Sequence, residues 1–150
     1  MNPIYEDIEG QTEEQLQQKC FFWFQNNYPE NRGCLFHVPN GGNRSGREGK
    51  RFKFIGVVSG VSDLILLVGG RAFLIELKAK GKKQSKEQRA WEHTMILNGF
   101  DYYVIDTLAE FKETVEAIMK VYTNRLPVSK QPRKDYTDLF LGLNNKKKDE

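Results

Sequence analysis

Two short apolar runs separated by a pair of glycines form the clearest pattern in the sequence. Residues 64–68 are all apolar, Gly69 and Gly70 follow, and residues 72–77 are apolar except at one acidic position. Runs of this length predict β-strands, and adjacent glycines are typical of a two-residue hairpin turn because both can adopt positive φ angles. The pattern therefore predicts a β-hairpin.

Three polar residues interrupt this hairpin at one end. Asp63 precedes the first run, and Glu76 and Lys78 lie at the end of the second. A turn at 69–70 places Asp63 opposite Glu76, and directly opposite residues have Cβ atoms about 4.5–5.5 Å apart. Glu76 and Lys78 share a face because they are two residues apart. One face should therefore carry two carboxylates and an ammonium group.

The paired carboxylates have two interpretations. Like charges directly opposite each other destabilise a sheet, and a divalent cation between them would remove that cost. Mg²⁺ is typically held by one or two carboxylates together with waters and substrate phosphates. Alternatively, Asp63 and Glu76 lie at a solvated strand end, where Lys78 forms an ordinary ion pair with one of them.

The region before the hairpin predicts an amphipathic helix that begins at Thr12 as N-cap. Its apolar face is formed by Leu16, Cys20, Trp23 and Phe24. Glu13 falls on the same face, either stabilising the helix start through the macrodipole or reaching the carboxylate pair. Glu14, at the edge of that face, is the alternative acidic residue.

The region after the hairpin predicts two more helices and a strand. Ser85 and Gln88 have the spacing of a capping box, and the helix ends at Asn98-Gly99. Gln88 lies on the inner face of this helix, and its spacing from Ser85 gives it a capping role. Residues 101–106 predict a strand, and Thr107 opens a helix that reaches about Tyr122.

These elements, with a short strand at 34–38, give the order α-β-β-β-α-β-α. A hairpin followed by a helix and another strand predicts a mixed central sheet flanked by helices, which is an α/β fold. We expect one domain over residues 1–125 and a basic, loosely ordered tail over 126–150.

Positive charge is concentrated in two segments, although the net charge is only +3. Segment 39–51 is predicted to be a flexible glycine- and arginine-rich loop. It is either a disordered insertion or an arm that contacts phosphates. The second segment, 78–89, follows the hairpin. The candidate nucleic-acid contacts in and beside these segments are Arg44, Arg47, Lys50, Arg51, Lys53, Lys82, Lys83 and Lys86.

The remaining composition points to an intracellular protein. The two cysteines have neither metal-site spacing nor a disulfide framework, which is typical of a reducing cytoplasm. The sequence has no apolar run of transmembrane length and no signal peptide. We therefore expect a soluble cytoplasmic protein that does not bind membranes.

The motifs together resemble the PD-(D/E)XK nuclease superfamily, and within it the VRR-NUC family. The resemblance rests on Gly60-Val61-Ser62-Asp63, on Glu76-Leu77-Lys78 and on Gln88 of the following helix, and covers roughly residues 12–111. Ser62 stands where the superfamily name has proline. The resemblance implies a restriction-endonuclease-like core. It also implies that Mg²⁺ or Mn²⁺ binds to Asp63, Glu76 and the carbonyl of Leu77. Lys78, Gln88 and the helix-borne Glu13 would complete the catalytic set. Besides its capping role, the amide of Gln88 would bind Lys78, a metal-bound water or a phosphate.

The function implied is a divalent-metal-dependent DNA endonuclease. The compact stand-alone form resembles phage-encoded nucleases that cut branched DNA, such as four-way (Holliday) junctions, inside a bacterial host. Two symmetric cuts require a homodimer, and Phe21, Phe22 and Trp23 offer surplus apolar surface, as do Tyr136 and residues 139–141 of the tail. The alternatives are a restriction or repair nuclease with another DNA substrate, and a non-catalytic nucleic-acid-binding module.

Overall fold

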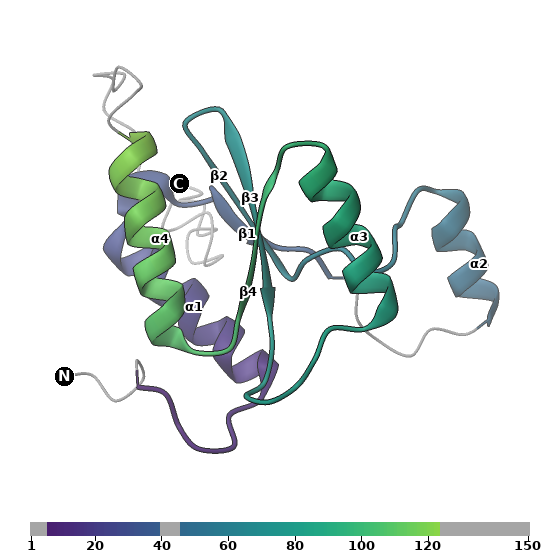
Figure 1. Cartoon of the computed structure of the whole chain (residues 1–150), viewed down its shortest axis with the longest axis horizontal. Helices are drawn as coiled ribbons and strands as arrows, with labels where there is room; N and C mark the ends of the chain where they lie inside the picture. The colour runs from purple at the N-terminus through teal and green to yellow at the C-terminus, as the bar shows by residue number, and fades with distance from the viewer. Residues whose placement is uncertain (1–5, 40–45, 124–150) are drawn as a thin grey trace, which may run out of the picture.

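A four-stranded mixed sheet forms the centre of the molecule (Figure 1). The computed structural model describes residues 6–39 and 46–123. The strands are β1 (Leu35–His37), β2 (Leu64–Val68), β3 (Arg71–Leu77) and β4 (Asp101–Ile105), in that spatial order. β1, β2 and β3 pair antiparallel, and β3 pairs parallel with β4. The predicted α/β class and mixed sheet are confirmed.

The β2–β3 hairpin has the predicted turn and register. Leu64 pairs with Ile75 and Val68 pairs with Arg71, so the loop consists of two glycines. Gly69 and Gly70 have φ angles of 59° and 75°, a conformation that strongly favours glycine. A Cβ atom at Gly69 would lie 2.8 Å from the Cβ atom of Tyr122, so this glycine also lets the last helix pack against the turn.

Helices cover the two faces of the sheet unequally. The helices α1 (Glu13–Asn27) and α4 (Leu108–Tyr122) lie together on one side, and α3 (Lys86–Leu97) lies on the other (Figure 1). A short 3₁₀ helix, η2 (Pro29–Asn31), follows α1, and α2 (Gly46–Phe54) lies at the outer edge of the molecule beyond α3.

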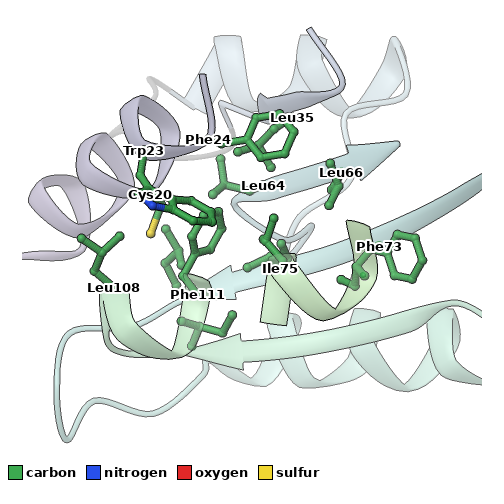
Figure 2. Packing of buried hydrophobic residues seen from close by; sticks show 14 of the residues in the cluster. Cys20, Trp23, Phe24, Leu35, Leu64, Leu66, Phe73, Ile75, Leu108 and Phe111 are labelled. Atoms are coloured by element: carbon green, nitrogen blue, oxygen red, sulfur yellow. The ribbon is translucent and has the colours of Figure 1, made fainter. Parts of the chain in front are cut away.

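The hydrophobic core fills the space between the sheet and the pair α1 and α4 (Figure 2). Alternate residues of the strands point into it, because side chains alternate between the faces of a sheet. The predicted inner face of α1 is confirmed. The core residues labelled in Figure 2 are Cys20, Trp23, Phe24, Leu35, Leu64, Leu66, Phe73, Ile75, Leu108 and Phe111.

The helix starts also follow the sequence. Thr12 and Gln15 form a complete capping box at α1, and Ser85 and Gln88 form another at α3. The hydroxyl of Thr107 accepts a hydrogen bond from the backbone N–H of Glu110 at the start of α4. These caps satisfy amide groups that would otherwise lack an intrahelical partner.

The prediction of a flexible loop over 39–51 was wrong for its second half. Residues 46–51 form the first part of α2, which continues to Phe54. Phe52, which follows the charged segment, lines an apolar cavity of about 390 Å³ with Val38, Val57 and Val61. This helix therefore has an apolar contact that its glycine- and arginine-rich sequence did not predict. Arg44, Tyr136 and residues 139–141 lie outside the described residues, as does the tail from 126 onward.

Candidate active site

Asp63 lies at the end of the hairpin, one residue before β2. Because Leu64 pairs with Ile75, the next position in the register lies opposite Glu76, as the sequence predicts. The Oδ2 atom of Asp63 accepts a hydrogen bond of 2.8 Å from the backbone N–H of Leu77. Its backbone carbonyl accepts one of 3.0 Å from the N–H of Val38. Asp63 is therefore tied to the strands on both sides of it.

Glu76 is fully buried on β3. Its Oε1 atom lies 2.6 Å from the Nζ atom of Lys78 and also accepts a hydrogen bond from the side-chain amide of Gln88. Its Oε2 atom is buried and has no hydrogen-bond partner among the described residues. Burial raises the pKa of Glu76 to about 7, and the nearby charge of Asp63 adds to this effect while Lys78 opposes it.

Lys78 lies two residues further along the chain, just past the end of β3, with 5% of its surface exposed. Its Nζ atom is 3.6 Å from the Oε1 atom of Glu13 as well as 2.6 Å from Glu76. Burial acts to lower the pKa of Lys78, but the surrounding carboxylates outweigh it and raise the pKa above its ordinary value. The side chain is therefore an ammonium group at neutral pH.

Glu13 brings the start of α1 to the same place. Besides its ion pair with Lys78, its Oε1 atom accepts a hydrogen bond of 3.3 Å from the backbone N–H of Ala79. Glu14 is exposed on the outside of α1. Of the two acidic residues that the sequence offered, the structure places Glu13 beside the hairpin.

Gln88 connects α3 to the carboxylate pair with the two ends of one amide. Its Oε1 atom accepts a hydrogen bond of 2.8 Å from the backbone N–H of Ser85, which completes the capping box. Its Nε2 atom donates to Glu76. The capping role is confirmed. The contact of the amide with Glu76 was not among the partners expected for it, which were Lys78, a metal-bound water and a phosphate.

Two further residues shape this site. Gly60 has a φ angle of 80°, and a Cβ atom there would clash with the backbone carbonyl of Glu87, so glycine lets the chain before Asp63 pass against α3. Tyr102 on β4 pairs with Leu74 and packs edge-on against Trp91. Burial, with the charge of Glu76 adding to it, raises the pKa of Tyr102. It lies on the same face as Glu76 because it pairs with Leu74, two residues before Glu76, and strand alternation in the sequence is the signal that could have identified it.

The basic residues lie outside this buried cluster. Lys82 and Lys83 are exposed on the connection between β3 and α3, and Lys86 is exposed in the first turn of α3. Arg47, Lys50, Arg51 and Lys53 are exposed on α2. The structure thus gathers Asp63, Glu76, Lys78, Gln88 and Glu13 into one cluster and leaves the basic residues on two surface elements.

The residues of the cluster suit a hard divalent cation. Carboxylate oxygens from Asp63 and Glu76 are the ligands that Mg²⁺ prefers, and the buried, unpartnered Oε2 atom of Glu76 is an oxygen without a donor among the described residues. No group of three acidic, histidine or cysteine side chains suited to a metal occurs within residues 6–39 and 46–123. Protein ligands beyond the two carboxylates would have to be other oxygens, such as a backbone carbonyl.

Comparison with known proteins supports the fold. No family model matches the chain, and no curated protein sequence is similar to it. A solved structure described as a "VRR_NUC domain protein" superimposes on this chain with a TM-score of 0.63 and 20% sequence identity, over 76% of this chain and 93% of the other. The chain therefore has the fold of this VRR_NUC domain protein. Across the described residues, no helix is long and apolar enough to cross a membrane.

Proposed function

We propose that this protein is a divalent-metal-dependent endonuclease that hydrolyses phosphodiester bonds in DNA. One observation carries the proposal: Asp63, Glu76 and Lys78 come together at one end of the central hairpin, on the fold of a VRR-NUC domain protein. A buried carboxylate with a strongly raised pKa, next to a second carboxylate and a lysine, is typical of a functional site.

Asp63, Glu76 and the backbone carbonyl of Leu77 would hold Mg²⁺ or Mn²⁺. Such an ion, when bound, polarises the scissile phosphate and lowers the pKa of a coordinated water. The hydrogen bond from the backbone N–H of Leu77 fixes one oxygen of Asp63, and the amide of Gln88 fixes one oxygen of Glu76. Residues that orient ligands in this way commonly contribute to metal affinity and activity.

Lys78 would act as a positive charge at the reacting phosphate. The raised pKa of Lys78 keeps its amine protonated at neutral pH, so it is suited to donate a hydrogen bond to a phosphate oxygen or to the attacking water. Stabilisation of the charge that develops on the phosphate is the role that fits an ammonium group. Glu13, which contacts both Lys78 and the backbone of Ala79, would position it.

The exposed basic residues would supply affinity for the DNA backbone. Lys82, Lys83 and Lys86 lie on the segment that leads from Lys78 to Gln88, close in sequence to both catalytic residues. Arg47, Lys50, Arg51 and Lys53 on α2, with Arg44 before it, would form the second contact. Contacts of this kind bind phosphates without reading the base sequence.

We further propose that the substrate is branched DNA, such as a four-way junction, and that the active form is a homodimer. A single site cuts one strand, so two symmetric cuts need two copies in a fixed orientation. Phe22 on α1, with 51% of its surface exposed, is a candidate contact between copies. The reaction would take place in the cytoplasm, in a bacterial host if a phage encodes the protein.

A cleavage assay tests the function. The purified full chain is incubated with Mg²⁺ or Mn²⁺ and with labelled linear, flap and four-way DNA of matched sequence, and its mass is measured by light scattering. We expect paired cuts in the four-way DNA, a dimeric mass, and a decrease of about a hundredfold or more in rate for Asp63→Asn and Glu76→Gln. DNA binding should persist in both variants because the basic residues supply it.

Asp101→Asn is the matched control, since Asp101 is a partly exposed carboxylate on the neighbouring strand, ion-paired with Arg71 at 3.1 Å. It should keep wild-type activity. Cleavage that continues in excess EDTA would refute the metal dependence. Tight DNA binding without cleavage of any substrate would instead identify a non-catalytic binding module.

A further inference from the structure

Helix α2 carries a basic face with an aromatic residue at its end. Arg47, Lys50, Arg51 and Phe54 occupy positions i, i+3, i+4 and i+7, so they lie on one side of the helix. All four are exposed. Gly49 and Phe52 are partly covered and form the opposite, inner side, where Phe52 lines the small apolar cavity beside Val38. This arrangement turns the cations and Phe54 toward solvent.

Phe54 is the most exposed large apolar side chain in the described part of the protein. It has 90% of its surface exposed, and Ile55, which follows it, has 65% exposed. Single exposed apolar residues are common on protein surfaces, whereas adjacent ones that form a patch often mark a contact site. The kind of partner depends on the charged residues beside Phe54, because a partner must bind the three cations of α2 as well as the aromatic ring.

The helix is linked to the candidate active site by a short piece of chain. The chain leaves α2 at Phe54 and reaches Gly60 six positions later, where it passes against the backbone of Glu87 and Gln88. Asp63 is three residues beyond Gly60. Only residues 55–62 therefore separate the end of α2 from Asp63 in the sequence.

We propose that this face of α2 binds DNA at a branch point, with the cations on phosphates and the ring of Phe54 stacked on an open base step. The inference rests on the proposed DNA substrate and adds the element that selects branched DNA. Aromatic side chains stack on bases that are unpaired or unstacked, and apolar side chains enter base steps that are easily opened. A regular duplex offers phosphates but no open base face.

A second copy of the chain is a poorer partner for this surface. Two copies of the α2 face in contact would bring Arg47, Lys50 and Arg51 of one protomer against the same cations of the other, and like charges across an interface oppose association. A polyanion with exposed aromatic faces satisfies both features of the surface. Branched DNA has this chemistry.

The test is a binding measurement that does not depend on cleavage. Fluorescence anisotropy in EDTA compares the full chain with Phe54→Ala and Phe54→Trp on a four-way junction and on a linear duplex of matched sequence. We expect Phe54→Ala to weaken junction binding about tenfold and to leave duplex binding unchanged, while Phe54→Trp retains junction binding. Replacement of Arg47, Lys50 and Arg51 by Ala should weaken binding to both DNAs. The slope of log K against log salt should fall by about 0.9 for each duplex phosphate that the variant no longer neutralises.

Leu97→Ala is the control, because Leu97 is 74% exposed at the end of α3 and belongs to neither the site nor the basic face. It should bind both DNAs as the wild type does. Equal affinities of Phe54→Ala and wild type for the junction would overturn the inference, as would equal decreases on junction and duplex. A lower mass for Phe54→Ala with unchanged junction preference would assign α2 to self-association and also overturn it.

This assay separates the inference from the proposed function. A protein that cleaves linear DNA and shows no effect of Phe54 refutes the branch contact and leaves the nuclease intact. A protein that prefers junctions through Phe54 but cuts nothing supports the branch contact and refutes the nuclease.

Discussion

The two faces of strand β3 are both buried over residues 73–77 but carry different side chains. Phe73, Ile75 and Leu77 point toward α1 and α4 and belong to the hydrophobic core. Glu76 and Lys78, on the alternate face, are also buried but contact Gln88 of α3 and Glu13 of α1. Adjacent residues along this segment thus belong alternately to the hydrophobic core and to the charged cluster.

The difference is in how each face compensates for burial. Apolar side chains gain free energy when they leave water, whereas a carboxylate must be paired and hydrogen-bonded to offset its desolvation. Glu76 has two donors on one oxygen and none among the described residues on the other. An apolar side chain in place of Glu76 would avoid this cost, and the charged face is what the proposed activity requires.

The largest effect that separates the faces is expected from a matched pair of substitutions. Ile75→Ala removes a fully buried core side chain and should lower the free energy of unfolding by about 2–5 kcal/mol. Glu76→Gln keeps the shape and an oxygen that can accept from Lys78, but it removes the negative charge beside this buried ammonium. It should therefore cost some stability, less than Ile75→Ala does, while abolishing cleavage. Denaturant unfolding and the cleavage assay measure the two effects. A large decrease in stability for Glu76→Gln would mean that the cluster is structural.

The sequence could predict this contrast because it depends on short-range geometry. The glycine pair sets the turn, the turn sets the register, and the register brings Asp63 to the position opposite Glu76. Strand alternation then separates Glu76 from Ile75 and Leu77. The start of α1 was predictable for the same reason, since Thr12 and the spacing of Leu16, Cys20 and Phe24 are local signals.

The parts that could not be predicted depend on contacts between distant segments. The donation from Gln88 to Glu76 requires the packing of α3 on the sheet, and the role of Gly60 appears only from its contact with the backbone of Glu87. Helix α2 was missed because Gly46 and Gly49 are poor helix formers, while Phe52 gains an apolar setting from Val38 and Val57. The basic face of α2 was consequently hidden within a supposed loop.

A change of pH is expected to have an intermediate effect on the stability of the protein. The pKa of Glu76 is raised from an ordinary 4.5 to about 7 by burial, and that of Asp63 is raised in the same direction and for the same main reason. The folded state therefore binds more protons than the unfolded state between these values, so stability should fall as pH rises from about 5 to about 8. Thermal melting in EDTA across this range measures the slope.

Glu76→Gln should flatten this dependence, because the amide does not titrate. Asp101→Asn, which changes a partly exposed carboxylate on β4, should leave the wild-type slope unchanged. A melting temperature of the wild type that stays constant or rises across the same range would contradict the raised pKa values. The apolar face gives no such dependence, since Ile75 and its neighbours have no group that titrates.

The smallest effects are expected where one amide serves both stability and the site. Ser85→Ala removes the hydroxyl that caps α3 and should cost about 1 kcal/mol of stability with little change in cleavage rate. Gln88→Glu keeps an oxygen that can accept from the N–H of Ser85 but removes the donor to Glu76. It also places a second carboxylate against the buried carboxylate of Glu76, so it should cost more stability than Ser85→Ala and lower the rate about ten- to a hundredfold. Unfolding and cleavage measured on both variants separate the two ends of the side chain. A decrease in rate for Ser85→Ala as large as for Gln88→Glu would show that Gln88 acts on activity only through the helix start.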